Sequence, residues 1–163
     1  MLIRKARPDD LPQVLRIYDH ARRFMAANGN PRQWGDSYPS AELTEQDILA
    51  GRCYVGIGGN GTPCCAFVFI IGNDPTYALI YNGEWVNDLP YGTIHRLASD
   101  GSQRGVFAEC LAFCLRLISN IRADTHEDNR IMQKLLEKHG FVRCGNIIVA
   151  NGSCRIAYQL VSG

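Results

Sequence analysis

Hydrophobic and polar positions alternate with two different periods along the chain of 163 residues. Stretches in which every second residue is apolar predict strands, and stretches with apolar residues three or four positions apart predict helices. Glycine, proline, asparagine and aspartate gather between these stretches and mark the turns. The predicted strands are residues 2–7, 53–57, 64–71, 91–98, 121–125, 141–149 and 154–160, and the predicted helices are residues 8–27, 41–50, 106–117 and 130–139.

Strands at both ends of the chain and βα units in its middle predict a mixed α/β sheet with helices packed on its faces, in the order β-α-α-β-β-β-α-β-α-β-β. We expect residues 1–163 to form one domain. A glycine turn at residues 58–61 predicts a hairpin, and Asn151-Gly152 predicts a second one of type I′. Residues 77–81 fit either an edge strand or a loop. The strand from Arg155 to Leu160 is a candidate docking edge for a homodimer.

Composition and charge exclude several classes of protein. Apolar residues make up 46% of the chain and charged residues 20%, which is an ordinary globular balance. The longest apolar run, Cys64 to Ile71, is much shorter than the roughly 20 residues that a membrane helix needs. The formal net charge of +1 gives no field that favours nucleic acid or an anionic membrane. The first residues do not form a signal peptide, so we expect a cytoplasmic protein.

Seven cysteines are an odd number, and none lies in a Cys-x-x-Cys pair. We therefore expect reduced and mostly buried thiols rather than a zinc site, while a thiol-based redox protein stays an alternative. His126 with Asp124, Glu127 and Asp128 resembles a metal cluster. Because Asp128 or Asn129 is better explained as the cap of the next helix, we predict no metal.

A turn of small residues, 99–105, joins the predicted strand at 91–98 to the helix at 106–117. Backbone N–H groups at the start of a helix converge there and carry about half a positive charge, so they bind anions. Arg104 adds a cation. The alternative is that Gly101 and Gly105 only make a tight connection.

This segment and a later one resemble the GNAT superfamily of acyl-CoA-dependent N-acetyltransferases. In that family a strand leads into a Q/R-x-x-G-x-G/A loop that opens a helix, and Gly105-Val106 stands there in this chain. The later segment is an asparagine followed by L-Y-E-K-x-G-F, matched by Asn129 and by residues 135–141, Leu-Leu-Glu-Lys-His-Gly-Phe. The opening residues 3–11 are also similar to the family's usual start, and the resemblance covers residues 2–160.

The resemblance implies a largely antiparallel sheet in which two neighbouring strands splay apart, with acetyl-CoA in the resulting notch. It also implies which residues hold each part of the cofactor. These are Leu97, Ala98 and Ser99 for pantetheine, the amides of Gln103, Arg104, Gly105, Val106, Phe107 and Ala108 for the pyrophosphate, and Asn129 and Gln133 beside the cofactor.

The implied reaction is direct attack of an amine on the thioester, which needs a base for the amine's proton and a donor for the carbonyl oxygen. His95 is the predicted base, because it lies two residues before Leu97 on the same face of a regular strand. The ordinary pKa of histidine, near 6.5, suits that role. A hydrogen-bonded histidine inside the sheet is the alternative. Glu84 is a second candidate base, and an exposed loop carboxylate is the alternative for it. A backbone amide near Leu97 or Ala98 is the candidate donor.

In this superfamily the region between the first two helices usually shapes the acceptor site, and here it contains Trp34 and Tyr38. An aromatic floor with Asp36 nearby suits a cationic or amphipathic amine. The alternative is a loop anchored by two buried aromatic rings. The acceptor class that we expect is a primary amine of a small molecule or peptide.

Three residues depart from the family's pattern. Ser102 stands where Gln or Arg is preferred, and Phe107 stands where Gly or Ala is preferred. Leu136 replaces the tyrosine that often acts as general acid on the leaving thiolate, so that role is vacant or filled from elsewhere. These departures leave a second hypothesis, a non-catalytic acyl-CoA sensor or interaction domain on the same fold.

Overall fold

Seven strands form one mixed sheet in the order β1-β2-β3-β4-β5-β7-β6, in a computed structural model that describes all residues 1–163. All neighbouring strands are antiparallel except β4 and β5, which are parallel. The predicted order of elements is confirmed. The elements are β1 (Leu2–Lys5), η1 (Pro8–Asp10), α1 (Leu11–Ala27), α2 (Ala41–Leu49), β2 (Cys53–Ile57), β3 (Pro63–Ile71), η2 (Pro75–Tyr77), β4 (Gly92–Ser99), α3 (Val106–Leu115), β5 (Asn120–Thr125), α4 (Arg130–Lys138), β6 (Val142–Ile148) and β7 (Cys154–Val161).

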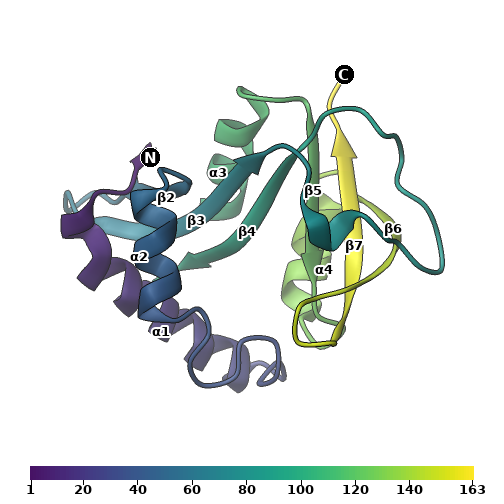
Figure 1. Cartoon of the computed structure of the whole chain (residues 1–163). Helices are drawn as coiled ribbons and strands as arrows, with labels where there is room; N and C mark the ends of the chain where they lie inside the picture. The colour runs from purple at the N-terminus through teal and green to yellow at the C-terminus, as the bar shows by residue number, and fades with distance from the viewer.

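The two faces of the sheet are covered differently. Helices α3 and α4 lie on one face, called the first face below, and α1 and α2 lie on the other, the second face (Figure 1). Residues 72–91 cover the rest of the second face, where Tyr77 and Tyr91 pack against Ile147 and Ala157. None of the helices combines the length and the hydrophobicity that a membrane-spanning segment requires.

Local capping explains where two of the helices begin. The Ser40 hydroxyl accepts a hydrogen bond from the backbone N–H of Leu43 at 3.1 Å, as predicted for the start of α2. The Asn129 side chain does the same for Met132 at 3.1 Å at the start of α4. Each cap satisfies an N–H group that the helix leaves unpaired and stabilises the fold by about 1 kcal/mol.

Strand β4 contains a bulge at Arg96, whose φ of +51° is rare for a residue with a side chain. His95 pairs with Val68 and therefore faces the second face, while Leu97 packs into the first-face cluster. The expectation that His95 and Leu97 share a face is wrong, because the extra residue shifts the alternation by one. Arg96 is held on the second face by Asp47 at 2.5 Å and by the Tyr38 hydroxyl at 3.0 Å.

Strands β4 and β5 meet at one end only. Their pairing consists of Gly92 with Ile121 and Thr93 with Arg122, whereas β5 pairs with β7 over six residues. Beyond Thr93 the two strands diverge, as Figure 1 shows from top to bottom. The edge of β4 from Ile94 onward therefore has no partner strand on the β5 side. The predicted splayed sheet is confirmed.

Two predictions about the last hairpin are wrong. Type I′ turns need a positive φ at both central residues, but only Gly152 has one, at +82°. The connection is longer, with the backbone N–H of Val149 bonded to the carbonyl of Ser153 at 3.0 Å. Strand β7 lies between β5 and β6, so residues 155–160 are not an available edge, and β6 is the edge strand.

Candidate functional site at the divergence of two strands

A cavity of about 50 Å³ lies between the diverging strands β4 and β5, and we call it the notch cavity. A larger cavity of about 220 Å³, the outer cavity, lies between the end of α1, the end of β4 and the start of α4. The two share Met25, Asn129 and Met132 in their walls, so they form one continuous track along the notch. The rest of the notch cavity is lined by Gln33, Ile94, Leu97, Phe107, Ala123, Asp124, Thr125 and Leu136.

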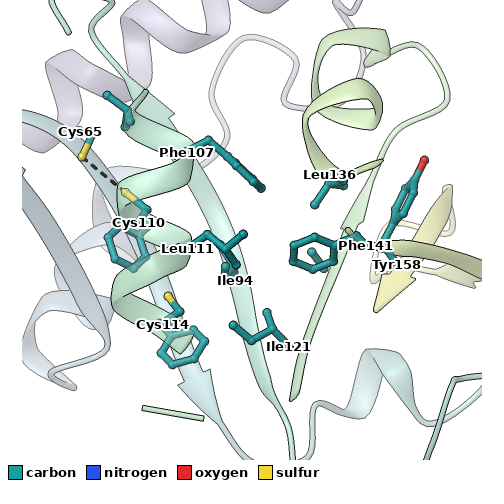
Figure 2. Close-up of a cluster of buried hydrophobic side chains, with 14 of the residues drawn as sticks. Cys65, Ile94, Phe107, Cys110, Leu111, Cys114, Ile121, Leu136, Phe141 and Tyr158 are labelled. Carbon is teal, nitrogen blue, oxygen red and sulfur yellow. Dashed lines mark hydrogen bonds between the residues drawn. The ribbon is translucent and has the colours of Figure 1, made fainter. Parts of the chain in front are cut away.

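Phe107 and Leu136, both labelled in the first-face cluster of Figure 2, belong to the first-face wall of the notch cavity. Phe107 is 7% exposed and packs against the imidazole of His139, with ring centres 5.0 Å apart. Leu136 is buried in the same hydrophobic cluster. The ring of Phe107 is therefore part of the core between α3 and α4, and its backbone amide stays in the first turn of α3.

The first turn of α3 reaches the notch cavity through the side chain of Phe107. Gly105 is the N-cap of α3, with φ of +72°, and no side chain caps the helix. A Cβ added at Gly105 would meet nothing within 4 Å, so the turn is open to solvent. The first-turn amides of Val106, Phe107 and Ala108 therefore have no side-chain acceptor, unlike those of α2 and α4. Such a terminus attracts anions.

The remaining residues of the predicted cofactor set divide by exposure. Ser99 lines the outer cavity, and Leu97 lines the notch cavity. Ala98 is buried in the second-face cluster. In the loop, Arg104 is exposed and Gln103 is half-buried.

Two buried polar atoms along the track have no hydrogen-bond partner, Asn30 Oδ1 and Thr125 Oγ1. Asn30 is 3% exposed and lines the outer cavity, and Thr125 is 0% exposed and lines the notch cavity. An unpaired buried polar atom costs roughly 1–3 kcal/mol. Such atoms in cavity walls are fit to bind the polar groups of a chain-like ligand.

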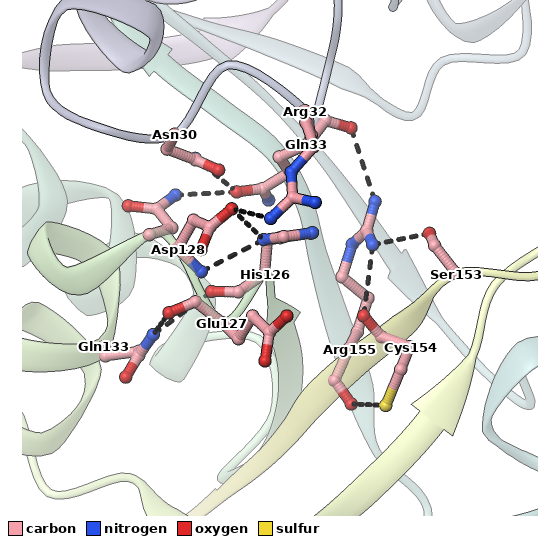
Figure 3. A network of polar contacts seen from close by, with 11 residues as sticks. Asn30, Arg32, Gln33, His126, Glu127, Asp128, Gln133, Ser153, Cys154 and Arg155 are labelled. Atoms are coloured by element: carbon pink, nitrogen blue, oxygen red, sulfur yellow. Dashed lines mark hydrogen bonds and ion pairs between the residues drawn. The ribbon is translucent and has the colours of Figure 1, made fainter.

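A polar network closes the track on the second face (Figure 3). The Gln33 side-chain oxygen accepts hydrogen bonds from the amides of Asn30 and Asn129, each at 2.9 Å. Arg155 donates to the backbone oxygen of Gln33 at 3.3 Å. This network ties the segment after α1 to α4 and β7, on the opposite side of the notch.

Gln133 does not line either cavity. Its amide nitrogen donates to the backbone oxygens of His126 and Glu127, at 3.1 and 2.9 Å. The residue therefore braces the connection between β5 and α4, next to Asn129 at the wall of the track.

His95 forms a pair with Asp74 on the second face, with 2.7 Å between Nε2 and Oδ2. Two further hydrogen bonds fix Asp74. The Thr76 N–H donates to its Oδ1, and the Asp74 backbone N–H donates to the Tyr91 hydroxyl. The hydrogen bond with His95 lowers the pKa of Asp74, although burial acts in the opposite direction. The carboxylate is therefore ionised at neutral pH and orients the imidazole.

Asp124 is the ionisable residue that lines the notch cavity, and it projects toward the second face from β5. Its Oδ2 accepts a hydrogen bond from the Tyr77 hydroxyl at 2.7 Å. Burial raises the pKa of Tyr77 well above its ordinary value, so this hydroxyl stays a donor. The ring of Tyr77 also lies 6.1 Å from that of His95, centre to centre. Tyr77 thus contacts both groups.

The other predicted site residues lie apart from the cavities. Glu84 is exposed and makes no hydrogen bond or ion pair. Trp34 is buried in the second-face core, edge-on to Tyr18 at 5.7 Å, which is the anchoring alternative foreseen for it. Tyr38 is 41% exposed and lies beside Trp34, with its hydroxyl on Arg96.

Sequence reasoning missed the roles of Asp74, Tyr77, Asp124, Thr125 and Gln33 in building this site. Asp74 and Tyr77 come from a loop without a periodic pattern, and the sequence around Asp124 indicates only a possible metal cluster. Thr125 carried one available signal, a polar residue that ends an apolar strand just before Asn129.

The cysteine thiols are mostly buried in the core, and the acidic cluster around His126 makes local hydrogen bonds. Six of the seven cysteines are buried and all seven are free, as expected from the sequence. The sulfurs of Cys65 and Cys110 lie 3.9 Å apart within the first-face core. His126 Nδ1 accepts the backbone N–H of Asp128 at 3.0 Å. No group of three or more His, Cys, Asp or Glu side chains is arranged to hold a metal ion.

The sequence matches no protein-family model and no curated protein. It is similar to the solved structure of a GNAT-family acetyltransferase from Streptococcus agalactiae, with 32% identity over 99% of this chain and 95% of that one, and a TM-score of 0.89. A GNAT-family acetyltransferase from Listeria monocytogenes has 20% identity, coverage of 99% and 94%, and a TM-score of 0.72. The NatC complex bound to Gag peptide and CoA has 14% identity, coverage of 99% and 98%, and a TM-score of 0.56.

Proposed function

Because the chain belongs to the GNAT acetyltransferase family, we propose that it transfers the acetyl group of acetyl-CoA to a primary amine of a small molecule or peptide. The observation that carries this proposal is the notch between β4 and β5, whose wall includes Phe107 from the uncapped first turn of α3. A long ligand with an anionic head and a polar, flexible arm suits such a track. The CoA in the related NatC structure is consistent with this fold binding such a ligand.

The residues present fit acetyl-CoA. The amides of residues 105–108 would hold the pyrophosphate, with Arg104 and Gln103 in the same loop. Ser99, Asn129 and the unpaired Asn30 Oδ1 would bind the pantetheine arm, and the free edge of β4 beyond Thr93 offers it backbone partners. When bound, acetyl-CoA supplies a thioester whose carbonyl carbon accepts the amine.

The second face would supply the acceptor and its base. The Asp124 carboxylate faces an incoming ammonium group in the notch cavity and would hold it by charge and hydrogen bonding. His95, oriented by Asp74 and lying outside both cavities, would take the proton that the amine loses through a bridging water. Tyr77 contacts both residues and keeps them in position. Glu84 has no role in this arrangement, because it is exposed and no hydrogen bond or ion pair orients it, whereas Asp74 orients His95.

Isothermal titration of the purified chain with acetyl-CoA, followed by a thiol-release assay with a panel of primary amines, tests this proposal. We expect saturable binding and release of CoA that depends on the amine. The panel would contain tyramine, spermidine, an amino-acid ester and an alanine-terminated peptide. Absence of binding at millimolar acetyl-CoA would overturn the proposal.

A non-catalytic acyl-CoA sensor is the second candidate, and the observation that favours it is Leu136 in the wall of the notch cavity. A sensor would bind acetyl-CoA in the titration and release no thiol with any amine of the panel. The two functions are therefore separated by the second half of the same experiment.

A further inference from the structure

Resting on the proposed function, we propose that the Thr125 hydroxyl donates a hydrogen bond to the leaving sulfur of the thioester. The side chain of Leu136 lines the same cavity and has no proton to give. Thr125 on β5 would thus stabilise the leaving sulfur, which Leu136 on α4 cannot do.

The position of Thr125 carries this inference. It is the last residue of β5 and lies where the strand has left β4. Its side chain is 0% exposed and lines the notch cavity, and its Oγ1 has no partner in the chain. A buried hydroxyl normally finds a partner, so one that does not is fit to bind a ligand atom.

Most other polar groups in the wall of the notch cavity are already used or have the wrong charge; the exception is the side-chain nitrogen of Gln33, which is only half-buried, unlike the Thr125 hydroxyl. The Asn129 side chain caps α4 with its oxygen and donates to Gln33 with its nitrogen. The Gln33 oxygen accepts two hydrogen bonds. Asp124 is a carboxylate, which repels a developing thiolate. Thr125 carries the one hydroxyl group among the residues that line this cavity.

The chemical step balances with these groups. The amine nitrogen forms a bond to the carbonyl carbon, the carbon–sulfur bond breaks, and the bonding electron pair passes to sulfur. The proton lost by the amine goes to His95 and from there to solvent. The Thr125 O–H keeps its own proton and stabilises the charge on sulfur by a hydrogen bond, because threonine is too weak an acid to give the proton up.

Two variants of nearly equal shape test the role. Thr125→Val removes the hydroxyl and should lower kcat about 10- to 100-fold, as loss of a hydrogen bond to a charged group does. It should also raise Tm by about 2–4 °C, because an unpaired buried polar atom is replaced by a methyl group. Thr125→Ser keeps the hydroxyl and should retain most of the wild-type kcat. If the Thr125 hydroxyl only stabilised the fold, Thr125→Val would lower Tm instead of raising it.

A binding measurement tests the same contact without an acceptor. At pH 9, where much of the free CoA thiol is ionised, Thr125→Val should weaken CoA binding about tenfold or more while acetyl-CoA binding changes little. An equal loss for both ligands, or no loss for either, would overturn the role of Thr125. If neither ligand binds the wild-type chain, the proposed function itself is wrong. If both bind and only kcat stays unchanged in Thr125→Val, the inference alone fails.

Discussion

At the scale of single residues, the chemistry depends on whether the imidazole of His95 is held as a base. The 2.7 Å contact with Asp74 fixes the ring, and Asp74 is itself fixed by two neighbours. We expect His95→Ala to lower kcat by about 10²- to 10⁴-fold, the usual contribution of a general base. The acetyl-CoA Kd should stay unchanged, because His95 lines neither cavity.

Steady-state rates between pH 6 and 9 and calorimetric titration with acetyl-CoA check this prediction. Asp74→Asn is the matched variant, since it keeps the shape of the side chain and removes the charge that orients the ring. A His95→Ala enzyme with the wild-type rate at every pH would remove His95 from the mechanism.

Asp124 is the second residue whose charge is open to a direct test. Asp124→Asn keeps the size of the side chain and the hydrogen bond from Tyr77, but removes the negative charge from the notch cavity. We expect KM for strongly basic amines to rise about tenfold, because a charge-assisted contact with the ammonium group is lost. Hydroxylamine, which is neutral at pH 7.5, is the control acceptor and should show the same KM with both enzymes. An equal change in KM for both acceptors would contradict an ammonium-binding role.

At the scale of secondary-structure elements, the start of α3 has the property that the proposal needs. Gly105 has a left-handed conformation in open surroundings, and no side chain caps the helix. Asparagine and aspartate both tolerate this conformation better than other residues, and they have the same shape. Gly105→Asp should therefore weaken acetyl-CoA binding at least tenfold more than Gly105→Asn, through repulsion between its carboxylate and the phosphate groups. Titration of both variants measures the difference, and equal affinities would mean that the pyrophosphate lies elsewhere.

Elements were also the level at which the sequence was most informative. The period of apolar residues is a local property, so it predicted each strand and helix to within a few residues. The bulge at Arg96 was not predicted, because it is stabilised by Asp47 on α2 and by Tyr38 in a loop. That one residue reversed the side of the sheet on which His95 lies relative to Leu97.

Only part of the candidate site was predicted, because only the segments with a local sequence pattern can be recognised from a single chain. The segments around Gly105 and Asn129 carry short-range patterns that the sequence shows; Asn129 lines both cavities, and Phe107, two residues after Gly105, lines the notch cavity. Asp74 and Tyr77 lie in a long loop, and only the folded chain brings them to β4 and β5. Contacts between residues far apart in the sequence leave no periodic signal in a single chain.

At the scale of the whole molecule, carboxylates with a lowered pKa make stability depend on acid. Hydrogen bonds lower the pKa of Asp10, next to Arg4, and of Asp74, next to His95, below the ordinary value of 3.8. A group with a lowered pKa in the folded state contributes its full stability above pH 3.8 and loses it as the pH falls through the folded value. We expect the urea midpoint to fall between pH 5 and pH 2.

Asp74→Asn removes one of these groups and provides the check. The variant should be less stable than the wild-type chain at pH 5, and the difference should shrink toward pH 2, where the wild-type Asp74 is protonated. A constant difference across this range would mean that ionisation of Asp74 does not contribute to stability.

The two-residue junction between β4 and β5 has a mechanical consequence. Only the pairs Gly92–Ile121 and Thr93–Arg122 join these strands, so the sheet consists of two halves that are connected at one end. Helix α3 contacts both strands, and the hydrogen bonds that Gln33 accepts from Asn30 and Asn129 also connect the two halves of the sheet. An elongated ligand bound between β4 and β5 would supply the missing backbone hydrogen bonds and make both halves of the sheet more rigid. Amide hydrogens on the free border of β4 would then exchange more slowly than those at the outer margins of the sheet.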